Sequence, residues 1–305
     1  MKNSNLKTVL LALLPMALWG SLFPFIKIGY EVFQINTESI PDILVFASMR
    51  FSICGIIVCL IGAARKAPFS SNRKKYVSLI IISGMFSIVL HYAFTYIGLT
   101  MTDSSKTALL KQLGALFYIC FAFLFIKGEK FSKFKLIGGI VGFLGIIAIN
   151  FTGAGFSLAI GDILIIMASV CSVISSVISK KCVEGNNSPF WIVGISQLVG
   201  GIILFAAGMI MGGKIPTFNL PSILVFAYIC TASIVAYVVF NTVQKQAPNS
   251  LLFIIKFAEP LFACIFGAIL LGENIFKLQY LFAFILISLG IFLGNKKESN
   301  TENDR

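Results

Sequence analysis

The sequence predicts an all-α integral membrane protein of ten transmembrane helices, arranged as two inverted repeats of five helices each. Three observations lead to this prediction: the composition is strongly apolar, ten apolar runs follow one another with short connections, and features of the first half recur in the second. Of the 305 residues, 58% are hydrophobic and only 12% are charged, whereas a soluble domain carries about a quarter charged residues. The composition excludes a disordered chain, a collagen-like fibre and a secreted disulfide scaffold.

Ten runs are long and apolar enough to span a bilayer, which requires about 20 mostly apolar residues per helix. In chain order they are Thr8–Ile28, Ile43–Gly62, Tyr76–Leu99, Ser105–Ile126, Phe134–Phe151, Ile160–Lys180, Phe190–Met211, Ser222–Gln244, Ser250–Leu271 and Phe276–Gly294. The first run is too long for the apolar part of a signal peptide, so we take it as the first span. The seven cysteines form no C-x-x-C motif, which predicts small packing residues and no metal site.

Basic residues are distributed unequally between the two sides that these spans define. With the N-terminus in the cytoplasm, 17 lysines and arginines fall in cytoplasmic segments, 3 fall on the other side and 4 lie within spans. The positive-inside rule therefore predicts a multi-pass protein of the inner or plasma membrane with both termini in the cytoplasm. The formal net charge of +12 is an orientation signal, and no nucleic-acid partner is expected.

Several short features of the first half recur 144 to 151 residues later. The pairs are Gly128-Glu129 with Gly272-Glu273, Leu144-Gly145-Ile146 with Leu289-Gly290-Ile291, Arg50 with Gln197, and Met16-Ala17 with Met167-Ala168. Because five spans is an odd number, the second copy enters the membrane in the opposite direction, an arrangement typical of secondary transporters with a site near the midplane. The predicted units are residues 8–151 and 160–294, followed by a cytoplasmic tail at 295–305.

Some of these motifs, taken in order along the chain, are similar to a known family. They are Ala17-Leu18-Trp19-Gly20-Ser21 in span 1, Arg50-Phe51 in span 2, the two Gly-Glu pairs, and Glu259-Pro260 in span 9. The chain resembles the EamA-type branch of the drug/metabolite transporter superfamily from about residue 8 to residue 294. The resemblance implies alternating access around a central cavity lined by spans 1, 3, 4, 6, 8 and 9, and many relatives export amino acids or other small polar compounds. Leu116 replaces the usual proline of span 4, so helix breaking is expected in the second repeat alone.

Ionisable side chains within spans are costly, and each is a candidate for contact with substrate. Lys111 lies about 9 Å into span 4 and Lys256 about as deep from the opposite start of span 9. We interpret them as cationic anchors for a carboxylate or phosphate, with snorkelling to the headgroups as the alternative. Glu259, near mid-bilayer, is a candidate for binding a proton or a substrate amine. Its alternative is a permanent ion pair with Lys256 or Lys111.

The remaining candidates divide into two groups. Trp19, His91, Tyr92 and Gln112 are predicted to contact substrate, whereas Arg50, Gln197 and Pro260 are predicted to have structural or gating roles. His91 is the only histidine and is a candidate proton site, with a structural hydrogen bond as the alternative. Pro260 removes a backbone donor within span 9. Span 2, which carries Arg50, is peripheral in the family that the chain resembles.

The sequence thus predicts a monomeric secondary transporter, and specifically an exporter of small polar metabolites such as amino acids or related carboxylates. Leaving aside residues assigned to the loops at span ends, the spans carry the basic residues Lys27, Arg50, Lys111 and Lys256 against Glu259 as the deep carboxylate, which favours anionic groups on the substrate. Proton exchange and uncoupled exchange are both left open as coupling modes. The alternatives are an exporter of organic cations or drugs, a channel, and a membrane-embedded enzyme. An enzyme is not expected, because one histidine and one deep carboxylate do not supply a paired acid–base set. No cofactor is expected either.

Overall fold

The computed structural model describes residues 2–99, 101, 110–125, 131–150, 159–272 and 278–294, and all regular structure in this part of the chain is helical. Seven helical segments within it are long and apolar enough to cross a membrane. Large apolar side chains point outward from the bundle, among them Ile210, which is 86% exposed. A soluble protein would bury such side chains, so the chain is an all-helical multi-pass membrane protein.

The helices follow the predicted spans closely where the chain is described. The first half contains α1 (Lys2–Val32), α2 (Ile40–Ala64), α3 (Arg73–Gly84), the π-helix η1 (Met85–Leu90), α4 (His91–Leu99), α6 (Leu113–Phe125) and α7 (Lys133–Asn150). The second half contains α8 (Ile160–Glu184), α9 (Pro189–Ile210), α10 (Leu220–Val243), α11 (Asn249–Lys256), α12 (Glu259–Leu271) and α13 (Leu278–Gly294). The predicted spans Ser105–Ile126 and Phe276–Gly294, and both Gly-Glu pairs, lie partly or wholly outside the described residues.

Three long helices begin with the same local chemistry. Ser39, Ser188 and Asn219 each accept a hydrogen bond from a backbone N–H of the first turn, and each is followed by a proline at the first or second helical position. A side-chain oxygen satisfies a backbone donor that the helix leaves unpaired, and proline has no such donor to lose there. The sequence therefore fixes where α2, α9 and α10 start.

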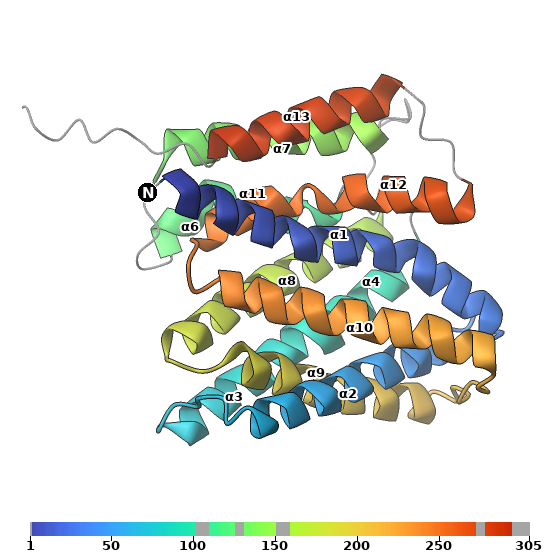
Figure 1. Cartoon of the computed structure of the whole chain (residues 1–305). Helices are drawn as coiled ribbons and strands as arrows, with labels where there is room; N and C mark the ends of the chain where they lie inside the picture. The colour runs from blue at the N-terminus through green and yellow to red at the C-terminus, as the bar shows by residue number, and fades with distance from the viewer. Residues whose placement is uncertain are drawn as a thin grey trace, which may run out of the picture.

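Two helix pairs lie at opposite ends of the bundle (Figure 1). The pair α2 and α9 forms one end and the pair α7 and α13 forms the other, with α1, α8, α10, α11 and α12 between them (Figure 1). Each pair joins a helix of the first half to a helix of the second half. The two halves of the chain are therefore intertwined rather than separate.

Glycines allow both pairs to approach closely. A Cβ atom on Gly55 would lie 2.6 Å from the Cα of Leu198, and one on Gly201 would lie 2.6 Å from the backbone nitrogen of Ser52. In the other pair, a Cβ on Gly138 would lie 2.6 Å from the carbonyl oxygen of Gly290. Such contacts between small residues replace the hydrophobic driving force that helices lack within lipid.

The connections that carry basic residues lie on one side of the bundle. The α2–α3, α8–α9 and α10–α11 connections lie on the same side as the N-terminus (Figure 1). They contain or adjoin Arg65, Lys66, Arg73, Lys181 and Lys245, all of which are exposed. The three-dimensional arrangement thus gathers these basic residues at one end of the molecule.

Candidate functional site

Two interrupted helices carry the lysines that the sequence singled out. Lys256 is the last residue of α11, and Phe257 and Ala258 form a turn before α12 begins at Glu259. Lys111 is likewise helical and is followed by a turn at Gln112, after which α6 begins at Leu113. The expectation that helix breaking is confined to the second repeat is therefore wrong. Span 4 is interrupted although it has no proline at this position, so the absence of a proline does not indicate an unbroken helix.

Lys256 points into the bundle rather than toward the lipid headgroups. Its Nζ donates a hydrogen bond to Ser172 Oγ on α8 at 3.3 Å and lies 5.9 Å from the centre of the Trp19 ring on α1. Trp19 in turn packs edge-on against Tyr237 of α10, with 5.3 Å between the ring centres. Helices α1 and α8 therefore contact this ammonium group directly, and α10 packs against it through Trp19.

Lys111 lies near the same region from the other broken helix. Its Nζ is 5.7 Å from the centre of the Phe23 ring on α1, a distance typical of a cation–π contact. Its charge also interacts with those of Glu259 and Lys256. Lys111, from the first half of the chain, is therefore close enough to Lys256 and Glu259, from the second half, to interact with their charges.

Glu259 is the first residue of α12, where a negative charge is favoured by the helix dipole. Neither Lys256 nor Lys111 forms an ion pair with it in the described part of the chain, so the permanent ion pair is not present in this conformation. The backbone of Glu259 packs against α1, since a Cβ on Gly20 would lie 2.9 Å from its carbonyl oxygen. Pro260 follows directly and occupies the second position of α12, where proline costs no hydrogen bond.

His91 and Tyr92 connect the lysines to a second basic group. His91 Nδ1 lies 2.9 Å from the carbonyl oxygen of Ala168 on α8, and its ring packs edge-on against Tyr92 at 5.2 Å. His91 also interacts electrostatically with Lys111 and Lys256. The structural hydrogen bond that was the alternative for this histidine is therefore present.

Arg50 extends into the interior, although its helix lies at the end of the bundle. Its side chain is 3% exposed, and its Nη2 donates a hydrogen bond to the Tyr92 hydroxyl at 3.0 Å. Tyr237 interacts electrostatically with both Arg50 and Glu259. We define the central polar cluster as Trp19, Arg50, His91, Tyr92, Lys111, Tyr237, Lys256 and Glu259.

Two of the predicted residues lie apart from this cluster. Gln112 is buried at the turn after Lys111, and no hydrogen bond in the described residues joins its side chain to the cluster. Gln197 is buried in α9, and neither atom of its amide has a hydrogen-bond partner among the described residues. The sequence reasoning missed Tyr237 and Ser172, because nothing along one chain segment indicates which polar residue of an apolar helix faces inward.

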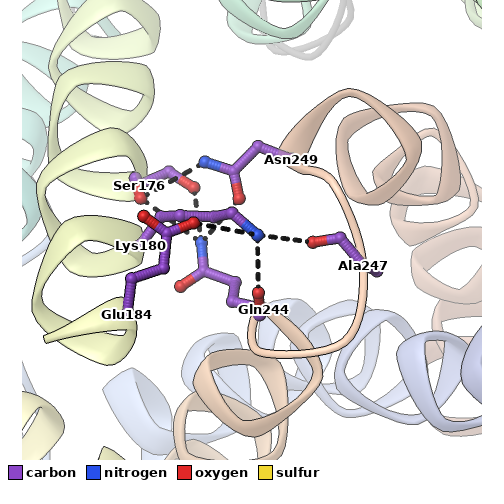
Figure 2. A network of polar contacts seen from close by, with 6 residues as sticks. All are labelled: Ser176, Lys180, Glu184, Gln244, Ala247 and Asn249. Atoms are coloured by element: carbon purple, nitrogen blue, oxygen red, sulfur yellow. Dashed lines mark hydrogen bonds and ion pairs between the residues drawn. The ribbon is translucent and has the colours of Figure 1, made fainter. Parts of the chain in front are cut away.

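A second polar network ties α8 to the connection between α10 and α11 (Figure 2). Lys180 Nζ donates to the carbonyl oxygens of Gln244 and Ala247, both at 2.8 Å, and lies 3.8 Å from Glu184. Gln244 Nε2 donates to Ser176 Oγ at 2.9 Å. The positive charge of Lys180 satisfies carbonyls at the end of α10, where the helix dipole favours a cation. We call this set, with Asn249, the Lys180 network.

Serines of α8 also join it to α3. Ser83 Oγ lies 2.8 Å from Ser175 Oγ and 3.1 Å from Ser179 Oγ, and all three residues are buried. The last residues of α8 and the connection between α10 and α11 lie on the side of the bundle that carries the N-terminus (Figure 1). These hydrogen bonds tie α8 both to α3 and to the connection between α10 and α11.

Comparison with known proteins agrees with the helical architecture. The sequence profile described as "EamA-like transporter family" matches residues 6–151 and 159–295. The chain is 27% identical over 298 residues to an inner membrane transporter of Escherichia coli K12, YedA, covering 91% of this chain and 92% of that protein. It is 25% identical over 305 residues to an Escherichia coli protein named "Probable amino-acid metabolite efflux pump", covering 94% of each. A crystal structure with 19% identity has a TM-score of 0.72 and covers 94% of this chain and 96% of its own.

Proposed function

The chain belongs to the EamA-like transporter family, and on this premise we propose that it is a secondary transporter which exports small polar metabolites, such as amino acids or related carboxylates, by alternating access. The observation that carries the proposal is the central polar cluster. It holds Lys111, Lys256 and Glu259 at helix interruptions inside a membrane bundle, without ion pairs between them in the described residues. Charged groups in this position are costly unless they serve a ligand or an ion.

We further propose that the fold consists of ten spans in two inverted repeats, residues 8–151 and 160–294, followed by a tail at 295–305. The helix contacts support this architecture because they occur in corresponding pairs. Helix α1 packs against α10, and α8 packs against α4; α1 packs against α12, and α8 packs against α6. Helices α1 and α8 also run in opposite directions (Figure 1), as the first helices of two inverted repeats must.

The orientation that we propose has both termini in the cytoplasm. The N-terminus and the basic connections lie on one side of the bundle (Figure 1), and basic residues favour the cytoplasmic side. In this orientation the Lys180 network lies on the cytoplasmic side, and we propose that it holds that side closed. The relatives named as transporters support a transporter rather than an enzyme. One relative is named as a probable efflux pump for amino-acid metabolites, which supports this substrate class and export.

The lysines and the carboxylate have different roles in this proposal. Lys111 and Lys256 attract the carboxylate of the substrate, and Glu259 receives an amine or a proton that couples transport. Trp19, His91 and Tyr92 form the wall beside them, while Gln112 is a neutral hydrogen-bonding group next to Lys111. Because a lysine ammonium is a compact point charge, it suits a carboxylate that arrives and leaves in each cycle.

A thermal-shift screen tests the proposal on the purified full-length protein. The panel contains amino acids, dicarboxylates, phosphorylated metabolites and quaternary amines. A ligand at about 100 times its Kd stabilises the folded state by about 2.7 kcal/mol. We expect an amino acid or carboxylate to raise the unfolding temperature of the wild type, and we expect Lys111→Ala to abolish that shift. Glu259→Gln should abolish the shift for amino acids but not for acids that lack an amine.

The control is Lys214→Ala, which removes an exposed lysine from the connection between α9 and α10. It should keep the full ligand-dependent shift, because the backbone N–H of residue 214 still donates to Asp42. Stabilisation by quaternary amines alone, unchanged in Lys111→Ala, would contradict the proposal and favour the alternative exporter of organic cations.

A further inference from the structure

Arg50 is a buried cation without a carboxylate partner in the described part of the chain. Its guanidinium carbon lies 4.3 Å from the centre of the Phe51 ring and 5.5 Å from that of Tyr92. Its Nη2 donates to the Tyr92 hydroxyl, whereas its Nε has no hydrogen-bond partner among the described residues. An arginine presents five donors and stays protonated in proteins. At least the Nε donor is therefore buried and unused in this conformation.

The surroundings of Arg50 are aromatic and neutral. The ionisable groups near it are Tyr92 and Tyr96 of α4, Tyr237 of α10, Tyr30 of α1, Cys54 of its own helix and Cys230 of α10. Tyrosine hydroxyls are uncharged near neutral pH, so they orient the guanidinium without neutralising it. An uncompensated buried charge is costly, and the usual solution is a carboxylate within hydrogen-bonding distance.

Arg50 and the two lysines belong to one polar region. Tyr237 interacts with both Arg50 and Glu259, and His91 packs against Tyr92 while interacting with both lysines. Tyr92 and His91 on one path, and Tyr237 and Trp19 on another, thus link Arg50 to the lysines. The central polar cluster contains three basic side chains and one acidic side chain, a formal excess of two positive charges (three minus one).

We propose that Arg50 binds a second acidic group of the transported molecule, so that the site takes molecules with two carboxylates in preference to those with one. The first carboxylate contacts Lys111 and Lys256, and the second contacts the guanidinium fork, whose planar donors match a carboxylate bidentately. The two carboxylates of such a molecule carry two negative charges, which match the formal excess of two positive charges in the central polar cluster. This inference rests on the proposed function, because it assigns a substrate class to the same site, and it gives Arg50 a binding role beyond the structural one that its sequence position suggests.

The test compares ligands that differ by one charge but little in shape. The probes are L-glutamate against L-glutamine and succinate against succinamate, measured as ligand-induced shifts of the unfolding temperature of the full-length protein. We expect the wild type to bind at least one of the two acids, L-glutamate or succinate, at least about tenfold more tightly than its amide. Truncating one partner of a buried charge pair typically costs that much or more. Equal affinity of the wild type for the acid and the amide in both pairs would overturn the inference.

Variants at Arg50 test whether this residue causes the preference for the acid over the amide. In Arg50→Gln the acid should bind no more tightly than the amide, while the affinity for the amide stays as in the wild type. Arg50→Lys keeps the charge without the fork and should recover part of the preference. Arg65→Gln removes an exposed arginine directly after the same helix. This control should leave the preference for the acid over the amide unchanged. A preference that persists undiminished in Arg50→Gln would assign it to the lysines and overturn the inference.

The outcomes separate this inference from the proposed function. If L-glutamine or another monocarboxylate stabilises the wild type and Lys111→Ala removes that effect, the proposed function stands whatever Arg50 does. If no amino acid or carboxylate stabilises the wild type, both are overturned. If Arg50→Gln does not fold, the ratio between acid and amide in the wild type and in Arg50→Lys still decides the question.

Discussion

Gly55→Val is expected to prevent the folded protein from forming. The first side-chain carbon at this position would lie 2.6 Å from the Cα of Leu198, and a backbone atom within a helix cannot move aside as a flexible side chain can. The helices α2 and α9 would have to separate. Overpacking of a buried contact costs about 1–3 kcal/mol or more, and here the contact joins the two halves of the chain. The measurement is the yield of monodisperse protein in size-exclusion chromatography after extraction into mild detergent.

Ala63→Val on the same helix is the matched control. Ala63 is exposed, so the added carbons face lipid or detergent and should leave the yield and the unfolding temperature close to those of the wild type. If Gly55→Val is as abundant and as stable as Ala63→Val, the close approach of α2 and α9 is not required for folding. Gly201→Val tests the same contact from α9, because its Cβ would lie 2.6 Å from the backbone nitrogen of Ser52.

Lys180→Met is expected to open the end of the bundle that carries the N-terminus. The substitution keeps an unbranched apolar stem but removes the ammonium that donates to the carbonyl oxygens of Gln244 and Ala247 (Figure 2). Hydrogen bonds to a charged group contribute about 1.5–3 kcal/mol each. Since about 1.4 kcal/mol changes an equilibrium tenfold, the open population should increase by at least about tenfold. The unfolding temperature should fall by several degrees.

A cysteine at position 247 reports this opening. Ala247 contributes only its backbone carbonyl to the Lys180 network and is buried, so Ala247→Cys keeps the network while its thiol is shielded. The rate at which a maleimide labels this cysteine, after subtraction of the labelling of the native cysteines, should be higher in the Lys180→Met background than with Lys180 present. Lys181→Met is the matched control, because Lys181 is exposed on the next position of the helix. Equal labelling in the two variants would show that Lys180 does not hold this end closed.

The helices themselves could be predicted from the sequence because a bilayer demands length and apolarity above all. About 20 mostly apolar residues form a span whatever their order, and the predicted start of α8 at Ile160 agrees with the structure. Caps at Ser39, Ser188 and Asn219 are local features of the same kind. The family could be predicted for a related reason, since its motifs are short and occur in a fixed order along the spans.

The interruption of span 4 shows the limit of local signals. A proline marks the break before α12, because it removes a backbone donor, and this break was anticipated at Pro260. The turn at Gln112 has no proline, and the sequence gives no other sign of it. Just after the turn, the backbone N–H of Gly114 donates to Ser169 Oγ of α8 at 3.1 Å, a bond between helices of the kind that compensates an interrupted membrane helix.

Which charged side chains meet was also decided by the tertiary structure. These helices are apolar on nearly every side, so the pattern of residues does not indicate the face that points inward. Glu259 and Lys256 share a helix face in the sequence, yet Lys256 donates to Ser172 instead of pairing with Glu259. Arg50, on a helix at the end of the bundle, reaches Tyr92 in the interior. The sequence by itself determined the membrane spans, the family and the list of costly charged residues, because each depends on composition and local order. Only the packing of the helices determined that Arg50, Lys111, Lys256 and Glu259 form one cluster, because contact across helices depends on the rotation of each helix about its axis.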